Sequence, residues 1–595
     1  MGEIRHPLSN AEVSAAFREF ADLLEIGGAN PFRVRAYRNA IKTIQGLTRP
    51  LKSMVQDGED LTELPGVGKD ISAQIVELFE AGDLSGVQEL EERTPRALAK
   101  LVRIEGLGPK KVAKLHQELG VVTPEDLERV LESGAAGDLP GFGEKTVEKL
   151  KGALEDFRSH QGRFLLAQVD DLMAPLLDHL RSGPGVERME LAGSTRRRRE
   201  TVGDADVLVQ CDGDAGAVVD HFTGYPGVAR IESAGETRGR IRLRSGLSVD
   251  LRVLPEDSYG AALHYFTGSK EHNVALRARA VKAGLRVNEY GVFRVPEGGG
   301  GDEDDPQRGE RVAGDTEASV YAALGLPWIP PVLRENRGEI QAAEAGTLPD
   351  LVQLDDLRGD LHMHTVWSDG KRSIREMVEA CRERGYEYLA ITDHSQAVTV
   401  ANGLGPERLR EQWEAIEEVR RDVEDIQILR GCEVDILKDG SMDLPDEELE
   451  GLDWVIAAVH SHMDMDEGTM TRRVIRALEH PSVNMLAHPT GRLLSRRQPF
   501  AIDMEAVLTA AVENRVAVEI NANPLRLDLN EVLAGRAREL GVPVVVNTDA
   551  HDVRQLDYVA YGVGQAQRAW LEAPQVLNTW KLRKVKDWLK DGSTP

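Results

Sequence analysis

The alternation of apolar and polar positions divides the chain into a helical first part, a mixed middle part and a last part rich in buried strands. Apolar residues at helical spacing from Val13 to Leu24, after Ser9 and Asn10 as N-caps, predict the first helix. The run from Leu247 to Leu254 alternates as a half-buried strand does. From about Arg358, seven apolar runs alternate with helical or turn stretches, which is typical of parallel strands joined by helices.

Three segments of the helical part repeat one pattern: an apolar residue, a Gly-apolar-Gly turn and a helix. The glycines permit positive φ and let backbone amides approach a phosphate, and the following helix N-terminus favours the anion. One such turn is common, whereas three copies with matching flanks indicate helix-hairpin-helix motifs that bind the DNA backbone. The glycines predicted to contact DNA are Gly66, Gly68, Gly106, Gly108, Gly141 and Gly143.

Composition narrows the class of protein. A chain of 595 residues with 41% hydrophobic and 29% charged residues is expected to form several soluble domains. No apolar run reaches the roughly 18 residues of a membrane helix, and the first ten residues lack the features of a signal peptide. Three widely spaced cysteines suit a reducing cytoplasm. The net charge of −27 bears on solubility and association. It does not exclude binding of phosphate, because local patches of charge decide where phosphate binds.

The stretch from Gly193 to Asp206 carries candidate chemistry. Asp204 and Asp206 precede an apolar run, so on a β-strand both carboxylates point to one face. Two such carboxylates are most easily kept ionised by cations, and Mg²⁺ bridged to phosphate oxygens is the commonest solution. Upstream, Gly193 and Ser194 offer an amide and a hydroxyl to a triphosphate, and Arg197 offers a bidentate guanidinium.

Two later stretches extend this candidate site. The strand 247–254 supplies a third carboxylate, Asp250, with Arg252 on the same face. The pair Tyr265-Phe266 beside Gly268 can stack on a sugar and bring the backbone near C2′, which disfavours ribonucleotides. Further along the chain, Asn273 can bond the minor-groove edge of an incoming base, and Arg277 lies on the same helix face.

These motifs and their order resemble the family X DNA polymerases of the nucleotidyltransferase superfamily, over about residues 1–350. The resemblance implies an α+β palm and thumb after α-helical helix-hairpin-helix regions. It implies that Asp204, Asp206 and Asp250 are catalytic and bind Mg²⁺ (or Mn²⁺), that Asp250 takes the proton of the primer 3′-hydroxyl, and that Arg252 orients Asp250. The implied nucleotide-binding residues are Gly193, Ser194, Arg197, Gly203, Tyr265, Phe266, Gly268 and Asn273, and Arg277 is implied to contact DNA.

Some members of this family have 5′-deoxyribose phosphate lyase activity, which uses a lysine late in the first helix-hairpin-helix motif as the Schiff base. The matching position here is Gln74, whose amide cannot form an imine. Lys69 lies five residues away, nearly a turn and a half of helix, and points elsewhere. The sequence therefore predicts no lyase activity by this route.

The seven apolar runs of the last part each end near a potential metal ligand. Ligands at the carboxyl ends of parallel strands predict a βα barrel with its site at one mouth. Imidazole and carboxylate together suit Zn²⁺, Mn²⁺ or Fe²⁺, and the number of ligands predicts two or three ions, which would activate a water and clamp a phosphate. The candidate ligands are His362, His364, Asp369, His394, Glu433, His460, His488, Asp549 and His551.

These motifs resemble the PHP (polymerase and histidinol phosphatase) domain, over about residues 356–595. All nine ligand positions expected in that family are filled, whereas degenerate PHP domains typically lose several. The resemblance therefore implies an active, distorted (β/α)7 barrel. Arg492, in the motif that begins at His488, is expected to contact the scissile phosphate.

The two resemblances in this order match bacterial and archaeal family X polymerases with a C-terminal PHP domain. We expect an acidic disordered loop at Gly298–Arg308 and a proline-marked linker after the thumb. The expected domains are 1–85 (lyase-like helical), 86–160 (fingers), 161–255 (palm), 256–330 (thumb), 331–355 (linker) and 356–595 (PHP).

The resemblance implies a polymerase that fills short gaps in base excision and related DNA repair, with a 3′–5′ exonuclease in the barrel. Its expected partners are gapped or primer–template DNA and dNTPs, without a membrane, and it is expected to be a cytoplasmic monomer. One alternative makes the barrel a phosphomonoesterase that cleans 3′-phosphate ends. Another makes the chain a non-catalytic scaffold on DNA ends, which the complete ligand sets disfavour.

Overall fold

The computed structural model describes residues 10–45, 47, 51–91, 93–102, 104, 106–160, 163–294, 307–494 and 497–591. The chain divides into two compact units, Met1–Arg163 and Phe164–Pro595. The predicted acidic loop lies outside the described residues except for Gln307 and Arg308. Among the described residues, no helix combines the length and apolarity that crossing a membrane requires.

The first unit contains helices and no strand among its described residues. The predicted first helix is confirmed as α1 (Asn10–Ile26), and it packs against α2 (Pro31–Gln45). The rings of Phe17 and Phe20 meet Tyr37 edge-on, with centroids 5.7 and 5.1 Å apart. The other helices are α3 (Leu51–Gln56), α4 (Lys69–Ala81), α5 (Ser85–Glu91), α6 (Leu98–Leu101), α7 (Pro109–Leu119), α8 (Pro124–Glu132) and α9 (Glu144–His160).

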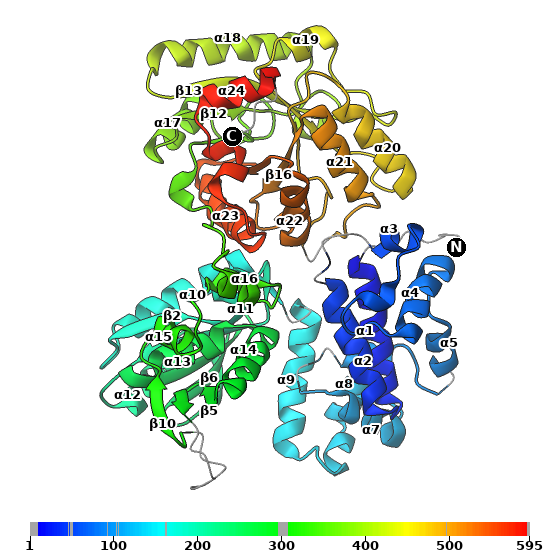
Figure 1. Ribbon diagram of the computed structural model, residues 1–595, viewed down its shortest axis with the longest axis vertical. Coiled ribbons are helices and arrows are strands. Elements are labelled where there is room, and N and C mark those ends of the chain that lie inside the picture. Colours follow the sequence, from blue (N-terminus) through cyan, green and yellow to red (C-terminus); the bar gives the residue numbers. More distant parts are fainter. Residues whose placement is uncertain are drawn as a thin grey trace. The chain divides into compact units, whose positions relative to one another are not determined.

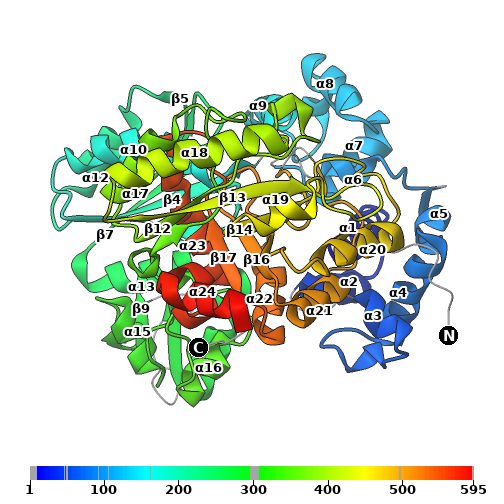
Figure 2. The same cartoon turned by 90° about the horizontal axis from the view of Figure 1, so that it is seen from above.

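The second unit begins with a five-stranded sheet of order β2-β4-β7-β6-β5, labelled in Figures 1 and 2. The central strands β4 and β7 are parallel, and the other neighbours are antiparallel. One face packs on α10 and α12, and the other on α13. The bounds are β2 (Arg188–Leu191), β4 (Asp204–Gln210), β5 (Val228–Ala234), β6 (Arg238–Leu243), β7 (Ser248–Leu254), α10 (Leu166–Arg181), α12 (Ala215–Thr223) and α13 (Glu256–Thr267). Beside this sheet, α11 (Gly193–Arg196) precedes β3 (Thr201–Val202), which pairs with β1 (Phe164–Leu165).

A smaller helical and three-stranded layer follows. It consists of α14 (Lys270–Lys282), β8 (Leu285–Asn288), β9 (Gly291–Arg294), β10 (Glu310–Ala313) and α15 (Glu317–Ala323). The segment predicted as a linker packs into the same core through Leu333, Ile340 and Leu351. It forms the short helix η3 (Pro331–Leu333) and α16 (Glu339–Ala345). This segment is therefore a structural part of the layer as well as a connection to the next one.

The remaining chain forms a seven-stranded parallel sheet of order β11 to β17 that curls into a nearly closed barrel, as the sequence predicts. The edges meet where Met363 pairs with Ala550, and where Leu361 N donates to Asn547 Oδ1 at 2.9 Å. The strands are β11 (Gly359–Asp360), β12 (Tyr388–Ile391), β13 (Gln427–Asp435), β14 (Trp454–Ala458), β15 (Met485–Leu486), β16 (Ala517–Asn521) and β17 (Val544–Asn547).

The barrel interior is a packed core. Alternate strand residues such as Tyr388, Trp454 and Ile456 fill it together with Trp580 and Trp588 from the C-terminal segment. Helices pack on the outside of the strands (Figures 1 and 2). They are α17 (Ile374–Glu383), α18 (Pro406–Asp422), α19 (Asp446–Glu450), α20 (Glu467–Leu478), α21 (Met504–Asn514), α22 (Glu531–Leu540) and α23 (Val559–Arg568). The last helix, α24 (Leu582–Asp591), instead contributes Val585 and Trp588 to the interior core.

Candidate active sites and nucleic-acid interface

Three carboxylates meet on one face of the central sheet. Asp206 of β4 stands opposite Asp250 of β7 in the parallel register, and Asp204 lies two residues earlier on the same face. Burial, together with the charges of Asp204 and Asp250, raises the pKa of Asp206 to about 7. Burial also raises the pKa of Asp250, although Arg240 opposes it. This concentration of negative charge, with oxygen donors only, fits Mg²⁺ or Mn²⁺.

Gly193 borders this acidic face. Its φ is +59°, and a Cβ built on it would lie 2.3 Å from Asp206 Oδ2. Glycine is therefore required both by the backbone conformation and by the close approach of the carboxylate. Ser194 follows it, half-buried on α11, and Gly203 separates β3 from β4. Gly193 thus contacts the acidic face directly, Ser194 and Gly203 lie next to it along the chain, and the nucleotide contacts of all three stay predictions.

Arg197 does not point freely to a phosphate site in this structure. Its Nε donates to Glu335 Oε1 at 3.0 Å, and its Nη1 donates to the carbonyl of Thr267 at 2.8 Å. Arg568 of the barrel helix α23 donates to the Arg197 carbonyl at 2.7 Å and also pairs with Glu335. To bind a nucleotide directly, the Arg197 guanidinium would have to break its ion pair with Glu335 and form one with a phosphate.

The arginine that contacts Asp250 is Arg240, not Arg252. Arg240 faces Asp250 across the antiparallel pair of β6 and β7, and its Nη1 lies 3.0 Å from Asp250 Oδ2. Arg252 shares the face of Asp250, but its guanidinium stacks over the ring of Phe266 at 4.3 Å. The expectation that Arg252 orients Asp250 is corrected, because the long side chain turns to the aromatic ring.

The predicted sugar and base contacts gather at the end of α13. The rings of Tyr265 and Phe266 meet edge-on at 5.1 Å. A Cβ on Gly268 would lie 2.6 Å from Asn273 Oδ1, so glycine lets the two segments approach closely. Asn273 Nδ2 donates to the carbonyl of Tyr265 at 2.7 Å, and Arg277 on α14 is exposed.

The three helix-hairpin-helix turns share one geometry. In each turn the residue between the glycines donates its amide to the carbonyl three residues earlier, as Val67 does to Leu64, and the three distances are all 3.0 Å. The first glycine has φ between +78 and +93°, and a Cβ on the second would meet nothing within 4 Å. The backbone amides before the following helix are thus open to an anion. The turns are Gly66–Gly68, Gly106–Gly108 and Gly141–Gly143.

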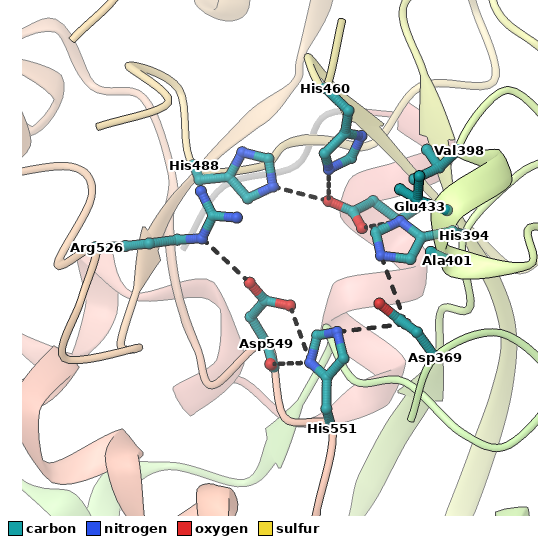
Figure 3. Close-up of a pocket in the computed structure, with 11 residues that line it drawn as sticks. Asp369, His394, Val398, Ala401, Glu433, His460, His488, Arg526, Asp549 and His551 are labelled. Atoms are coloured by element: carbon teal, nitrogen blue, oxygen red, sulfur yellow. Dashed lines mark hydrogen bonds and ion pairs between the residues drawn. The ribbon is translucent and has the colours of Figure 1, made fainter. Parts of the chain in front are cut away.

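The nine candidate ligands of the barrel come together at the carboxyl ends of the strands, and Figure 3 shows most of them around one pocket. Eight of them form three groups whose ligand atoms lie within 4.8 Å of one another. The ninth, His488, has its Nε2 2.9 Å from Glu433 Oε1. The groups are His364, Asp369, His394 and His551; His362, His364 and Asp549; and His394, Glu433 and His460.

Several of these ligand atoms are buried without a hydrogen-bond partner among the described residues. They include His362 Nε2, both ring nitrogens of His364, and Glu433 Oε2. Buried polar atoms normally have partners, and a metal ion supplies one. Burial lowers the pKa of His364 to about 3, so it is a neutral ligand. Burial would also lower the pKa of His551, but Asp369 and Asp549 raise it to about 9, so a metal ion would compete with a proton there. The residues therefore fit a centre of two or three transition-metal ions.

Two carboxylates that sequence reasoning missed hold the ligand histidines. Glu519 Oε1 lies 2.7 Å from His362 Nδ1, and Asp435 Oδ1 lies 3.2 Å from His460 Nδ1. Such contacts fix the orientation of a metal-bound imidazole. For Glu519 the available signal is an acidic residue between apolar neighbours in the buried strand β16. For Asp435 it is the position at the end of β13, two residues after Glu433 and therefore on the same face of the strand.

The arginine at the barrel pocket is Arg526, not Arg492. Arg526 lines the pocket with its Nε 3.5 Å from Asp549 Oδ2 (Figure 3). Arg492 is buried and donates to the carbonyls of Arg526 and Leu527 and to the carboxylate of Glu200. The expected contact of Arg492 with a phosphate is corrected, since its donors are already used.

Comparison with known proteins agrees with this architecture. The chain matches a helix-hairpin-helix domain over residues 8–84, a SAM-like helix-hairpin-helix tandem over 98–156, the DNA polymerase beta thumb over 262–335 and the PHP domain over 360–523. It is 38% identical to the DNA polymerase/3′-5′ exonuclease PolX of Bacillus subtilis, over 95% of this chain and 97% of that protein. The chain belongs to the PolX family.

Other relatives match a smaller part of this PolX family member and are named as phosphatases. A probable phosphatase of Thermoanaerobacter sp. is 29% identical over 39% of this chain and 94% of its own length. A probable phosphatase of Shewanella sp. is 30% identical over 35% of this chain and 80% of its own length. The similarity to the Bacillus protein spans both catalytic regions, and the structure places candidate metal-binding clusters in the second of them.

Proposed function

We propose that this protein is a DNA-directed DNA polymerase that fills short gaps in DNA repair and that its barrel is a 3′–5′ exonuclease. The observation that carries the proposal is the convergence of Asp204, Asp206 and Asp250 beside Gly193, in a chain that also holds a complete PHP ligand set. Its substrates are gapped or primer–template DNA and dNTPs. The full-length similarity to a polymerase and exonuclease supports both activities in one chain.

In the palm, Asp204, Asp206 and Asp250 hold Mg²⁺ (or Mn²⁺). The bound ions supply positive charge to the phosphate oxygens during nucleotidyl transfer. Asp250 accepts the proton of the primer 3′-hydroxyl, and Arg240, 3.0 Å away, stabilises the ionised carboxylate that takes it. Gly193 and Ser194 bind the triphosphate through the backbone amide and the hydroxyl.

The remaining palm and thumb residues select the substrate. Tyr265, Phe266 and Gly268 face the sugar, and Asn273 reads the minor-groove edge of the incoming base. Exposed Arg277 contacts the template strand, and the backbone amides of the three helix-hairpin-helix turns bind phosphates of the DNA backbone. This arrangement binds DNA without reading its sequence.

In the barrel, the nine ligands hold two or three ions of Zn²⁺, Mn²⁺ or Fe²⁺. The bound ions supply an activated water for attack on a phosphodiester. Glu519 and Asp435 hold His362 and His460 in the ring orientation that binding requires. We further propose that the protein is a monomer and that it is cytoplasmic. Its three unpaired cysteines favour the second point, because the cytoplasm is reducing.

The experiment is nucleotide addition and removal on one gapped duplex, with Mg²⁺ or Mn²⁺. We expect addition up to the end of the gap when dNTPs are present, and stepwise removal from the 3′ end when they are absent. A protein that adds no nucleotide under any of these conditions contradicts the polymerase assignment. Removal of a 3′-phosphate without removal of nucleotides would instead assign the barrel as a phosphomonoesterase.

A further inference from the structure

Arg526 offers an unused set of donors at the barrel pocket. It is the one arginine or lysine among the described residues that line this pocket, which otherwise holds carboxylates, imidazoles and three small apolar side chains. Its Nε lies 3.5 Å from Asp549 Oδ2, and its side chain is 19% exposed. Within the described part of the chain, its Nη1 and Nη2 have no hydrogen-bond partner. A guanidinium in this position can donate two parallel hydrogen bonds to a phosphate.

The segment that carries Arg526 is held by Arg492. Arg492 Nε donates to the Arg526 carbonyl at 3.0 Å, and its Nη2 donates to the Leu527 carbonyl. Leu527 has a φ of +41°, a conformation that a residue with a side chain rarely adopts. Two hydrogen bonds from one rigid, buried guanidinium therefore fix the backbone from which the Arg526 side chain extends.

The partner of Arg492 comes from the palm. Glu200 Oε2 accepts from Arg492 Nη2 at 2.7 Å, and Glu200 Oε1 lies 3.4 Å from Nη1. Glu200 ends the Gly-Ser-Thr-Arg-Arg-Arg-Arg-Glu stretch that begins at Gly193, and its carbonyl accepts from Leu166 N at 3.1 Å. Arg492 is 7% exposed, so its charge needs a close counterion. Asp528 also faces it electrostatically, but the hydrogen-bonded carboxylate is that of Glu200.

We propose that Arg526 binds the scissile phosphate in the barrel and that Glu200 of the palm, acting through Arg492, is a positioning residue for it. The chain of contacts runs from Glu200 to Arg492, from Arg492 to the carbonyls of residues 526 and 527, and from Arg526 into the metal pocket. The proposal rests on the proposed hydrolysis of nucleic acid ends. It makes the exonuclease site depend on a carboxylate of the polymerase palm.

The test compares full-length Arg526→Gln, Arg526→Lys and Glu200→Gln with the wild type. Arg337→Gln is the control for Glu200→Gln, because it removes another ion pair to the barrel, at 3.3 Å from Glu531, without touching Arg492. Removal of a 3′ nucleotide is measured on a single-stranded oligonucleotide without dNTPs. Inorganic phosphate serves as a probe, through the inhibition constant and the thermal shift of the metal-loaded protein, and bound metal is measured for every variant.

For Arg526→Gln we expect unchanged metal content, phosphate binding weakened at least about tenfold, and kcat/KM lowered roughly 100-fold. Arg526→Lys should recover part of both losses, because lysine keeps the positive charge but cannot donate two parallel hydrogen bonds to a phosphate. For Glu200→Gln we expect weaker phosphate binding and kcat/KM lowered about three- to tenfold, more than for Arg337→Gln.

Wild-type phosphate binding in Arg526→Gln would overturn the assignment of Arg526. Equal behaviour of Glu200→Gln and Arg337→Gln would overturn the positioning role of Glu200. A wild-type protein that removes no nucleotide would refute the proposed exonuclease activity alone. The role of Arg526 could still be tested in that case, because phosphate binding is measured without turnover. Arg526→Lys and thermal unfolding of each variant separate these outcomes from a failure to fold.

Discussion

Asp206 and Asp250 stand opposite each other on the parallel strands β4 and β7, with no residue of another strand between them. Neighbouring strands are about 4.8 Å apart, so the two carboxylates repel each other unless a proton or a cation lies between them. Burial, together with the charges of Asp204 and Asp250, raises the pKa of Asp206 to about 7. Without metal ions, this repulsion destabilises the folded palm, and bound Mg²⁺ or Mn²⁺ would relieve it.

Asp206→Asn should stabilise the metal-free protein at alkaline pH. The pKa of Asp206 is about 7 in the folded protein and near 3.8 in the unfolded chain, so the folded protein binds more protons between these values. The free energy of unfolding therefore falls as pH rises through this window, and the penalty is complete above pH 7. Urea unfolding in a chelator should show a gain of about 1 kcal/mol at pH 8 that shrinks at pH 5. A variant no more stable than the wild type at pH 8 contradicts the argument.

Arg240→Gln should move the pH profile of nucleotide addition to higher pH. Arg240 lies 3.0 Å from Asp250 and opposes the rise of its pKa, so removing the cation should raise that pKa further. The rate of addition is measured from pH 6 to 9. Arg252→Gln is the matched control, because Arg252 stacks on Phe266, and its shift should be smaller. A larger shift for Arg252→Gln would restore the role that the sequence indicates for Arg252.

The palm shows what a sequence can and cannot predict. That Asp204 and Asp206 share a face follows from the period of a strand, which is a local property. The contact of Arg240 with Asp250 depends on the register of β6 against β7, which no local pattern specifies. The chemistry of Arg197 predicts a phosphate contact, but its pairing with Glu335 joins residues 138 positions apart. The direction of a long side chain is decided by the packed structure.

In the barrel too, the positions of the ligands could be predicted from the sequence, whereas the direction of a long side chain could not. Apolar runs in the sequence locate the strand ends, so they predict that all nine candidate ligands lie at one mouth, where the folded chain brings them together. The resemblance of the His488 motif to the PHP domain implies that Arg492 contacts the phosphate, yet its guanidinium pairs with Glu200 of the palm. The linker after the thumb is marked by prolines, which signal a change of chain direction but say nothing about burial.

Glu519→Gln should weaken metal binding in the barrel and leave the palm unaffected. Glu519 accepts from His362 Nδ1 at 2.7 Å and from the His488 amide at 2.8 Å, so it fixes two ligands at once. Loss of such a contact typically costs 10- to 100-fold in metal affinity. Metal content after dialysis against a weak chelator measures this effect. Glu505→Gln, on the outside of the barrel beside Arg536, is the control and should keep its metal.

The protein should form no Schiff base with a 5′-deoxyribose phosphate end. Gln74 occupies the position expected of the lyase lysine, and its Oε1 accepts a hydrogen bond from the Tyr37 hydroxyl at 2.5 Å. Borohydride treatment with an incised abasic duplex should leave no covalent adduct, under conditions in which a known lyase is trapped. An adduct would refute this prediction, and its loss in Lys69→Ala would identify the nucleophile.

The most direct test measures nucleotide addition and nucleotide removal by Asp206→Ala and by His362→Ala on the same gapped duplex. We expect Asp206→Ala to lose addition by roughly 100- to 1,000-fold and to keep removal, and His362→Ala to show the reverse. Loss of both activities in either folded variant, or addition that survives in Asp206→Ala, would contradict two separate metal sites with the three palm carboxylates at the centre of synthesis.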